Sequence, residues 1–210
     1  MPYGYTGQNL INQTKKNSGV FSISDVASLE KQGKFGGSTE HIITSTASSS
    51  AIEFVDKFAN FDIFKIQLIN CVPSTQTEFG IQFSNDSGTS YETTNYEYSN
   101  RRGFANNTFE LRKSTSQSSI RLGGDVETSD NLNSTIYIYN LNDASDYTYI
   151  TQHSVFKGTS GGGGFGFEQG GGLYGVAEVV NGIKIGQAVT ASAFTSGTVK
   201  LYGIKNRWAL

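Results

Sequence analysis

The densest run of large apolar residues in the chain, at positions 52–83, alternates with polar residues at the period of a β-strand. The run predicts one strand on each side of Pro73, and each strand has one apolar face. The two faces consist of Phe64, Ile66, Leu68 and Val72, and of Phe79, Ile81 and Phe83. Asn70 interrupts the first row, and Cys71 falls on its opposite face. Because each apolar face must be buried against a second layer, the pattern predicts packed sheets.

Shorter alternating segments continue this pattern along the chain. The further predicted strands are 41–48, 51–55, 90–99, 109–113, 119–123, 134–141, 147–156, 173–180, 183–189 and 196–204. Residues 84–89 predict a hairpin turn, and the rest of 100–116 predicts a loop. Short strands separated by turn signals at roughly 8–12-residue intervals are typical of an antiparallel β-sandwich. We therefore expect an all-β, jelly-roll-like sandwich.

The first 38 residues differ from the rest. They are polar, except for a short apolar stripe that predicts a helix near 24–32, with Ser22 or Ser24 as its N-cap. We expect an N-terminal docking arm at 1–38 that becomes ordered on assembly, and a β-sandwich domain at 39–210. The side chains that we expect to dock are Tyr3, Tyr5, Val20, Phe21, Phe165, Phe167 and Trp208.

The glycine-rich stretch at 158–172 predicts a loop. It is not a phosphate-binding loop, because neither a Gly-Lys-Ser/Thr motif nor a helix signal follows it. Phe165 and Phe167 lie between its glycines, and full exposure of two such rings is unfavourable. The sequence leaves two alternatives open: the rings pack within their own domain, or they pack against a neighbouring subunit.

Composition narrows the function classes. Charged residues make up 16% of the chain, against roughly 25% in soluble domains, and the formal net charge is -2. Basic residues are scattered and form no run longer than a pair such as Lys15-Lys16 or Arg101-Arg102, so we expect no nucleic-acid binding. The N-terminus lacks the apolar core of a secretory signal, and no run of about 18 apolar residues occurs. We therefore expect neither secretion nor membrane insertion.

Residues able to carry chemistry are few and scattered. The single cysteine, Cys71, falls within a predicted strand and reads as a buried apolar residue. His41 and His153 lie far apart, without neighbouring cysteine or histidine residues. The available carboxylates read as ordinary solvated groups: Asp86, Glu92, Glu97, Glu110, Asp125 and Glu127. We expect no catalytic residue, metal ligand or cofactor.

Tyrosine offers the best candidate for recognition. Tyr96 and Tyr98 fall on one face of a predicted strand, and Tyr137 and Tyr139 share a face of another. Aromatic faces beside amide and carboxylate side chains bind saccharides, but sheets also bury such faces at subunit interfaces. The sequence leaves both roles open: the tyrosines bind a bacterial surface glycan, or they pack against a neighbouring protein.

Several motifs together resemble a known group of proteins. These are FKIQLINCVPS, the turn FSNDSGTSY, the strand IYIYNL, the glycine-rich stretch and the final SGTVKLYGIK. Their order resembles β-sandwich proteins of tailed bacteriophages, especially phages of marine and aquatic bacteria, which are tail-fibre, adaptor or other minor virion proteins. The segment 17–33 also resembles leader segments of such proteins. The resemblance covers about residues 17–205 and brings no catalytic residues with it.

This resemblance implies a non-enzymatic structural protein of the virion, made in the host cytoplasm and anchored by its arm. A tail-fibre or fibre-adaptor position is expected, with a capsid decoration or head-fibre protein as one alternative. A receptor-binding module for surface glycan is a second alternative, and a polysaccharide depolymerase ranks third. The implied partners are other virion proteins and further copies of the chain, as a trimer by likeness to fibre proteins.

Overall fold

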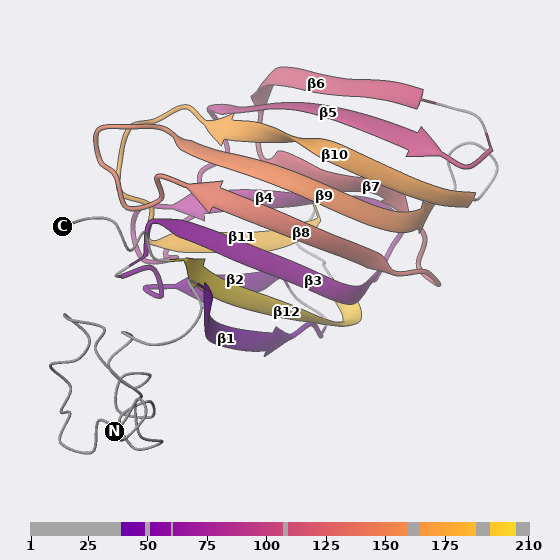
Figure 1. The fold of residues 1–210 in the computed structure, drawn as a ribbon, viewed down its shortest axis with the longest axis horizontal. Coiled ribbons are helices and arrows are strands. Elements are labelled where there is room, and N and C mark those ends of the chain that lie inside the picture. Colours follow the sequence, from indigo (N-terminus) through magenta and orange to yellow (C-terminus); the bar gives the residue numbers. More distant parts are fainter. Residues whose placement is uncertain are drawn as a thin grey trace, which may run out of the picture. The chain divides into compact units, whose positions relative to one another are not determined.

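The computed structural model describes residues 39–48, 51–59, 61–106, 109–158, 164–187 and 194–204. Within these ranges the regular secondary structure consists of strands alone (Figure 1). The strands are β1 (Thr39–Thr46), β2 (Ile52–Val55), β3 (Ile63–Pro73), β4 (Thr77–Ser84), β5 (Tyr96–Phe104), β6 (Phe109–Gln117), β7 (Ile120–Val126), β8 (Leu132–Tyr139), β9 (Thr148–Gly158), β10 (Gly164–Tyr174), β11 (Gly182–Gln187) and β12 (Phe194–Ile204). The all-β class is confirmed, whereas the arm and its helix near 24–32 lie outside the described residues.

Hydrogen bonding joins the described strands into one antiparallel sheet that branches at β9. The front layer follows the order β1-β12-β3-β8-β9-β10-β5-β6, and the back layer follows β7-β4-β11-β2. A single residue pair, Val126 with Gly158, connects β7 of the back layer to β9. Figure 1 shows the back layer behind the middle strands of the front layer. The sheet therefore nearly closes into a barrel, and the predicted jelly-roll-like sandwich is not confirmed.

The core lies between these two layers. Phe79 of β4 stacks on Phe194 of β12, with ring centroids 4.9 Å apart and planes inclined by 10°. The two predicted apolar rows lie in opposite layers. The strand β3 belongs to the front layer because it pairs with β12 and β8, and β4 belongs to the back layer because it pairs with β7 and β11. Both rows are buried as predicted from Phe64 to Leu68 and from Phe79 to Phe83.

A bulge in β3 changes the prediction for the end of the first row. Asn70 has a positive φ of 51°, and the register with β8 shifts between Leu68 and Cys71. The Asn70 N–H donates to Asn133 Oδ1 at 2.8 Å. The extra residue turns Cys71 into the core, as expected of a buried cysteine, and leaves Val72 only half-buried.

Several predicted strand limits were wrong. The glycine-rich stretch is not a loop from 164 onward, because β10 pairs along its whole length with β9 and from Gly166 onward also with β5. The segment 100–116 is mostly strand, in β5 and β6. Residues 90–95 and 175–180 are not strand. The chain does turn near 84–89, but no hairpin forms, since β4 and β5 pair with different strands.

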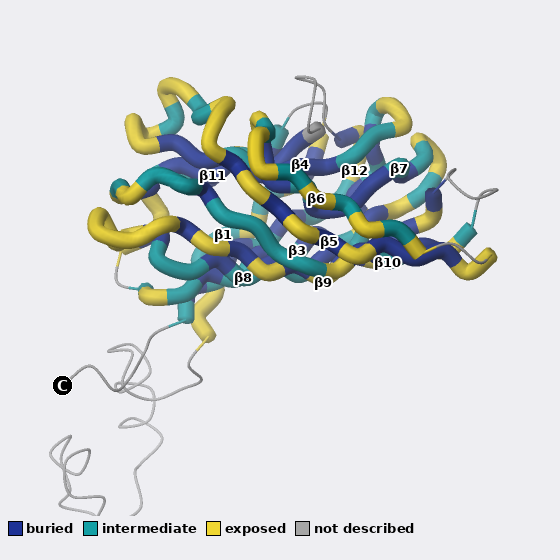
Figure 2. The backbone as a smooth tube through the Cα atoms, turned by 90° about the horizontal axis from the view of Figure 1, so that it is seen from above, coloured by how far each residue is buried: buried dark blue, intermediate teal, exposed yellow. Residues whose placement is uncertain are grey.

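The front layer has one buried and one exposed face. Burial alternates strictly along β9, where every second residue from Thr148 to Gly158 is buried. Figure 2 shows buried positions next to half-buried or exposed ones along the strands of this layer. The exposed side, called the outer face below, carries the candidate site.

Candidate functional site

Two aromatic rings meet on the outer face across a glycine. The registers place Phe167 of β10 beside Gly103 of β5, and Gly103 beside Phe109 of β6. Because Gly103 has no side chain, the two rings approach edge to face, with centroids 6.3 Å apart. A Cβ at Gly103 would lie 2.6 Å from Phe167 and 2.9 Å from Phe109. The glycine therefore makes room for this pair.

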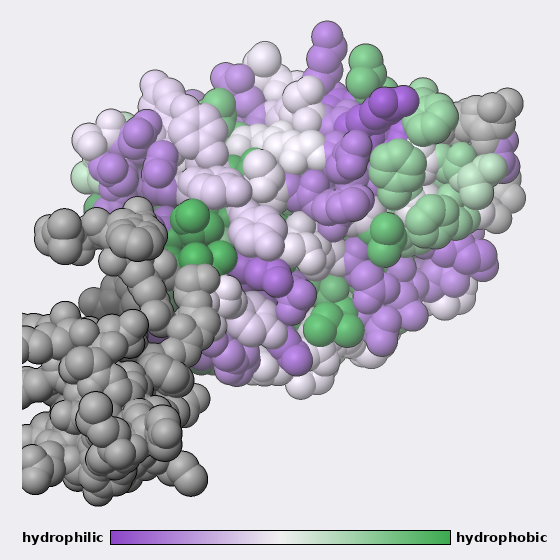
Figure 3. All heavy atoms as spheres, in the orientation of Figure 1, coloured by the Kyte–Doolittle hydropathy of each residue, from purple (hydrophilic) through white to green (hydrophobic). Residues whose placement is uncertain are grey.

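Further apolar side chains extend the pair into a larger surface, the apolar patch. The patch consists of Phe109, Leu111, Val155, Phe165 and Phe167. Leu111 is 81% exposed, Phe109 64% and Phe165 56%. Figure 3 shows hydrophobic side chains gathered at the right end of the front layer. The Arg101 guanidinium lies 4.7 Å from the centre of the Phe109 ring and marks the polar rim.

A groove of about 690 Å³ lies farther along the outer face; we call it the Tyr149 groove. Tyr98, Tyr149 and Leu173 line it together with the polar residues Glu97, Ser99, Lys113, Ser114 and Thr115. Gly171 and Gly172 of β10 contribute no side chain to fill it. A Cβ at Gly172 would lie 2.5 Å from the Glu97 carbonyl oxygen, so only glycine fits there. The groove thus combines an aromatic wall with hydrogen-bonding groups.

The structure separates the four tyrosines that the sequence grouped together. Tyr96 and Tyr98 point into the core, and the Tyr96 hydroxyl accepts a hydrogen bond from the Phe83 N–H at 2.7 Å. Burial raises the pKa of Tyr96. Tyr137 and Tyr139 lie half-buried on the outer face of β8, and Lys65 Nζ is 6.0 Å from the Tyr137 ring. Among the tyrosines that the structure describes, the exposed ones are instead Tyr147 and Tyr149.

Of the expected docking residues, only Phe165 and Phe167 can be placed. Tyr3, Tyr5, Val20, Phe21 and Trp208 lie outside the described residues. The structure brings Phe165 and Phe167 together with three apolar side chains that the sequence did not single out, Phe109, Leu111 and Val155. The alternation of Phe109 and Leu111 with Glu110 and Arg112 was the signal that could have identified two of them.

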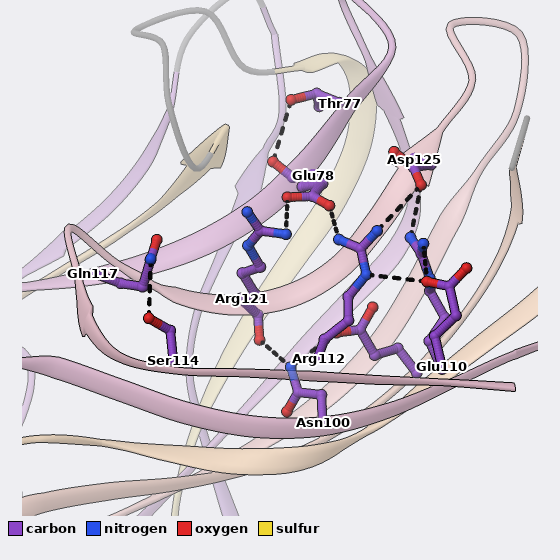
Figure 4. Close-up of polar contacts among 11 residues, drawn as sticks. Thr77, Glu78, Asn100, Glu110, Arg112, Ser114, Gln117, Arg121 and Asp125 are labelled. Carbon is purple, nitrogen blue, oxygen red and sulfur yellow. Dashed lines mark hydrogen bonds and ion pairs between the residues drawn. The ribbon is translucent and has the colours of Figure 1, made fainter.

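A cluster of charged side chains lies at the same end of the molecule on the inner face of the front layer. We call it the charge network: Glu78, Arg102, Glu110, Arg112, Arg121 and Asp125 (Figure 4). Arg102 of β5 donates to Glu110 of β6 at 2.6 Å and to Asp125 of β7 at 2.7 Å. Glu78 of β4 accepts from Arg112 and Arg121. The network therefore links both layers.

The pKa values of two glutamates beside these arginines are shifted in opposite directions. The hydrogen bond from Arg102 lowers the pKa of Glu110. Burial raises the pKa of Glu168, although the Asn100 amide donates to its Oε1 at 2.8 Å. Among the described side chains, Glu168 Oε2 and Arg102 Nε have no hydrogen-bond partner. The sequence pattern did not predict this network. Glu110 and Asp125 are ion-paired and are not the ordinary solvated carboxylates that we expected.

The remaining candidates for chemistry stay apart. His41 bonds to Thr44 Oγ1 at 2.8 Å on β1, while His153 lies on β9. Burial raises the pKa of the Cys71 thiol to about 11. Hydrogen bonds from Ser90 lower the pKa of Asp86 to about 2. Within the described ranges, no group of three or more His, Cys, Asp or Glu side chains could hold a metal ion.

Comparison with known proteins finds no matching family model, no similar curated protein and no matching solved structure. The described part of the chain also contains no helix long and apolar enough to cross a membrane. Function is therefore inferred from the outer face and from the sequence motifs.

Proposed function

We propose that this chain is a structural, non-enzymatic subunit of a tailed-phage particle and that the apolar patch is its contact with a neighbouring subunit. The observation that carries the proposal is the exposure of Phe109, Leu111 and Phe165 around the Phe109–Phe167 ring pair at one end of the outer face. Contiguous exposed apolar side chains rimmed by polar residues mark protein interaction sites.

The chemistry of the patch fits a protein neighbour. Aromatic side chains and arginine are enriched at protein interfaces, and here Arg101 contacts the Phe109 ring. The rings are held by neighbouring strands and not by a loop, because the ladders of β9, β10, β5 and β6 fix their spacing. A rigid surface loses little conformational entropy when it docks.

The phage assignment is supported by the order of sequence motifs and by a surface rich in hydroxyl and amide groups. A tail position, as a fibre or fibre-adaptor component, follows from the same resemblance. In this proposal the curled sheet serves as a jelly-roll-like rigid body, residues 1–38 fasten it to the particle, and the apolar patch contacts the next subunit. Repetition of weak contacts in a symmetric particle increases the total binding strength.

Patch variants in a phage that carries this gene would test the proposal. In the double variant Leu111→Ser, Phe165→Ser, we expect a folded protein that is depleted from purified particles, as measured by quantitative mass spectrometry. Val179→Ser is the matched control, because Val179 is also apolar and 45% exposed but lies outside the patch. Normal incorporation of the double variant, or absence of the wild-type chain from particles, would contradict the proposal.

A second candidate function is saccharide binding in the Tyr149 groove, as in a receptor-reading module. The observation that favours it is the exposed ring of Tyr149 beside Glu97, Lys113 and several serine and threonine residues in an open groove. Sugar rings pack their apolar C–H faces on aromatic rings and present hydroxyl groups for hydrogen bonds. Tyr96 is fully buried and cannot take part, whereas Tyr98, although mostly buried, is one of the residues that line the groove.

A glycan array with the full chain would test this second function. We expect binding that is weakened in Tyr149→Ala and unchanged in Tyr147→Ala. The two tyrosines have similar exposed fractions, 40% and 43%, but only Tyr149 lines the groove. Equal losses in both variants, or no bound glycan, would argue against the groove.

A further inference from the structure

The strand β6 ends the front layer and leaves one edge without a strand partner among the described residues. It pairs with β5 alone. Its outer positions carry Phe109, Leu111 and Lys113, and its inner positions carry Glu110 and Arg112. An unpaired strand presents a row of backbone N–H and C=O groups that can pair with another strand.

The sequence of β6 is complementary to itself in the antiparallel direction. If two copies meet with Leu111 opposite Leu111, Glu110 of each copy faces Arg112 of the other. In the same register Phe109 faces Lys113, so that an aromatic ring lies beside an ammonium group. Opposite charges and aromatic pairs directly across a ladder stabilise a sheet, and like charges destabilise it.

Other symmetric registers are less favourable. A two-fold axis perpendicular to the sheet keeps the outer faces of both copies on one side, so outer residues must pair with outer residues. Centring the axis on residue 110 or 112 places Glu110 opposite Glu110 or Arg112 opposite Arg112. Centring it on residue 113 places two lysines together. Leu111 is the centre that brings unlike charges together and keeps like charges apart.

The exposed fractions fit this register. Leu111, at the proposed axis, has the highest exposed fraction of the large apolar side chains that the structure describes, 81%. Glu110 is still 41% exposed on its side chain although it accepts a hydrogen bond from Arg102, so it remains accessible to Arg112 of a second copy. The described residues leave Leu111 and Glu110 open to a strand laid along β6. Arg112 is 19% exposed and already pairs with Glu78 and Glu110 of its own chain, so in the pair it would add Glu110 of the second copy to this network.

We propose that two copies of this chain pair through β6, antiparallel and centred on Leu111, to form one continuous sheet. The pairing places the two apolar patches next to each other on one surface, where they form a single larger contact for a neighbour. This inference deepens the proposed assembly role and names a second copy as the first partner. It predicts a two-fold pair in place of the trimer suggested by likeness to fibre proteins.

Disulfide cross-linking of the full chain tests the register directly. The chain has a single cysteine, Cys71, which is buried and whose raised pKa keeps it as a thiol, so an added surface cysteine is the reactive one. Under mild oxidation, Leu111→Cys should form covalent dimers much faster than the control Val179→Cys. Phe109→Cys and Lys113→Cys should cross-link with each other when mixed, and far less when each is alone.

Sedimentation equilibrium supplies a second measurement. The wild-type chain should show a monomer–dimer equilibrium, and Leu111→Glu should shift it to monomer, while far-UV circular dichroism stays unchanged. A wild-type chain that remains monomeric, or equal cross-linking rates at 111 and 179, would overturn the pairing. If pairing is absent but the variant containing Phe165→Ser is still lost from particles, only the pairing is wrong. If pairing occurs in a chain absent from particles, only the virion role is wrong.

Discussion

Arg102 of β5 donates a hydrogen bond through Nη1 to Asp125 Oδ2 of β7 at 2.7 Å, and this bond connects the front layer to the back layer. The Arg102 side chain is 2% exposed, and its Nη2 donates to Glu110. Arg112 adds contacts at 3.5 Å to both Glu110 and Asp125. The backbone ladder joins β7 to the front layer through one residue pair only. The side chains of the charge network therefore hold the two layers together at this end.

Removing Arg102 should weaken the fold. Arg102→Ala leaves Glu110 and Asp125 with only the longer contacts to Arg112, and loss of one partner of a buried ion pair costs about 3–5 kcal/mol. The side chains of Glu110 and Asp125 are partly exposed, at 41% and 24%. We therefore expect the free energy of unfolding to fall by about 3 kcal/mol, the lower end of this range. Urea denaturation followed by circular dichroism would measure it.

The neighbouring arginine provides the control for that experiment. Arg101 lies on the outer face, where it contacts the Phe109 ring. Arg101→Ala should cost less than about 1 kcal/mol, since an exposed cation–ring contact contributes little. Equal losses at 101 and 102 would show that the buried network does not stabilise the fold.

Stability should depend on pH through Glu168. Burial raises the pKa of this carboxyl above its ordinary value of 4.5 in the folded chain, so the folded state binds its proton more tightly than the unfolded state. The resulting stability is complete below about pH 4 and is lost as the pH rises through the folded pKa. Glu168→Gln should remove this loss and make the chain more stable than wild type at neutral pH.

Glu110 should act in the opposite direction. The bond from Arg102 lowers its pKa, so its contribution is present above the ordinary value and is lost as the pH falls through the folded pKa. Urea midpoints of wild type, Glu168→Gln and Glu110→Gln over an acidic-to-neutral series would separate the two. If Glu168→Gln keeps the wild-type slope above pH 4.5, the proposed titration is wrong.

Three glycines of the outer-face strands should differ in their tolerance of alanine. Gly172→Ala places a Cβ 2.5 Å from a backbone oxygen, which cannot move aside, and overpacking of this kind costs about 1–3 kcal/mol. Gly103→Ala meets the Phe167 and Phe109 rings, of which exposed Phe109 can swing away, so its cost should be smaller. Gly164 has no atom within 4 Å of an added Cβ and should be neutral. Thermal denaturation should therefore rank the variants 172, 103 and 164, with the largest loss first.

The packing between the layers gives a further prediction. Phe79 is fully buried and stacks on Phe194, so Phe79→Ala leaves a cavity between β4 and β12. Truncation of a buried phenylalanine costs about 3–5 kcal/mol. Val179→Ala, at an exposed site, should change the unfolding free energy by less than about 0.5 kcal/mol. Similar urea midpoints for both variants would show that the stacked pair is not in the core.

Much of the fold was predictable because alternation is a local property. A side chain in a strand points to one face or the other according to its position, so rows such as Phe64 to Leu68 and Phe79 to Phe83 reveal a buried face without any knowledge of the partner strand. The same rule identified the two faces of β8. It failed at Cys71, because the Asn70 bulge inserts a residue and reverses the faces beyond it.

The outer-face site was only half predictable. Phe165 and Phe167 were singled out because large rings among glycines are conspicuous, but their segment was assigned to a loop. β10 is a strand since β9 and β5 supply ladder partners on both sides, and the glycines let their backbones approach closely. Phe109 and Leu111 were overlooked because their polar neighbours gave β6 no apolar run.

By itself, the sequence determined that the described chain is all-β and which residues of its clearest strands are buried up to the Asn70 bulge. The burial of Cys71 was predicted from its residue type and not from the alternation. Only the tertiary structure decided which strands pair, that β3 and β4 lie in opposite layers, and that distant charged residues meet around Arg102. The physical reason is the separation along the chain of the residues that interact. Side-chain alternation follows from the geometry of neighbouring peptide units, whereas strand pairing and ion pairing depend on contacts between residues far apart along the chain.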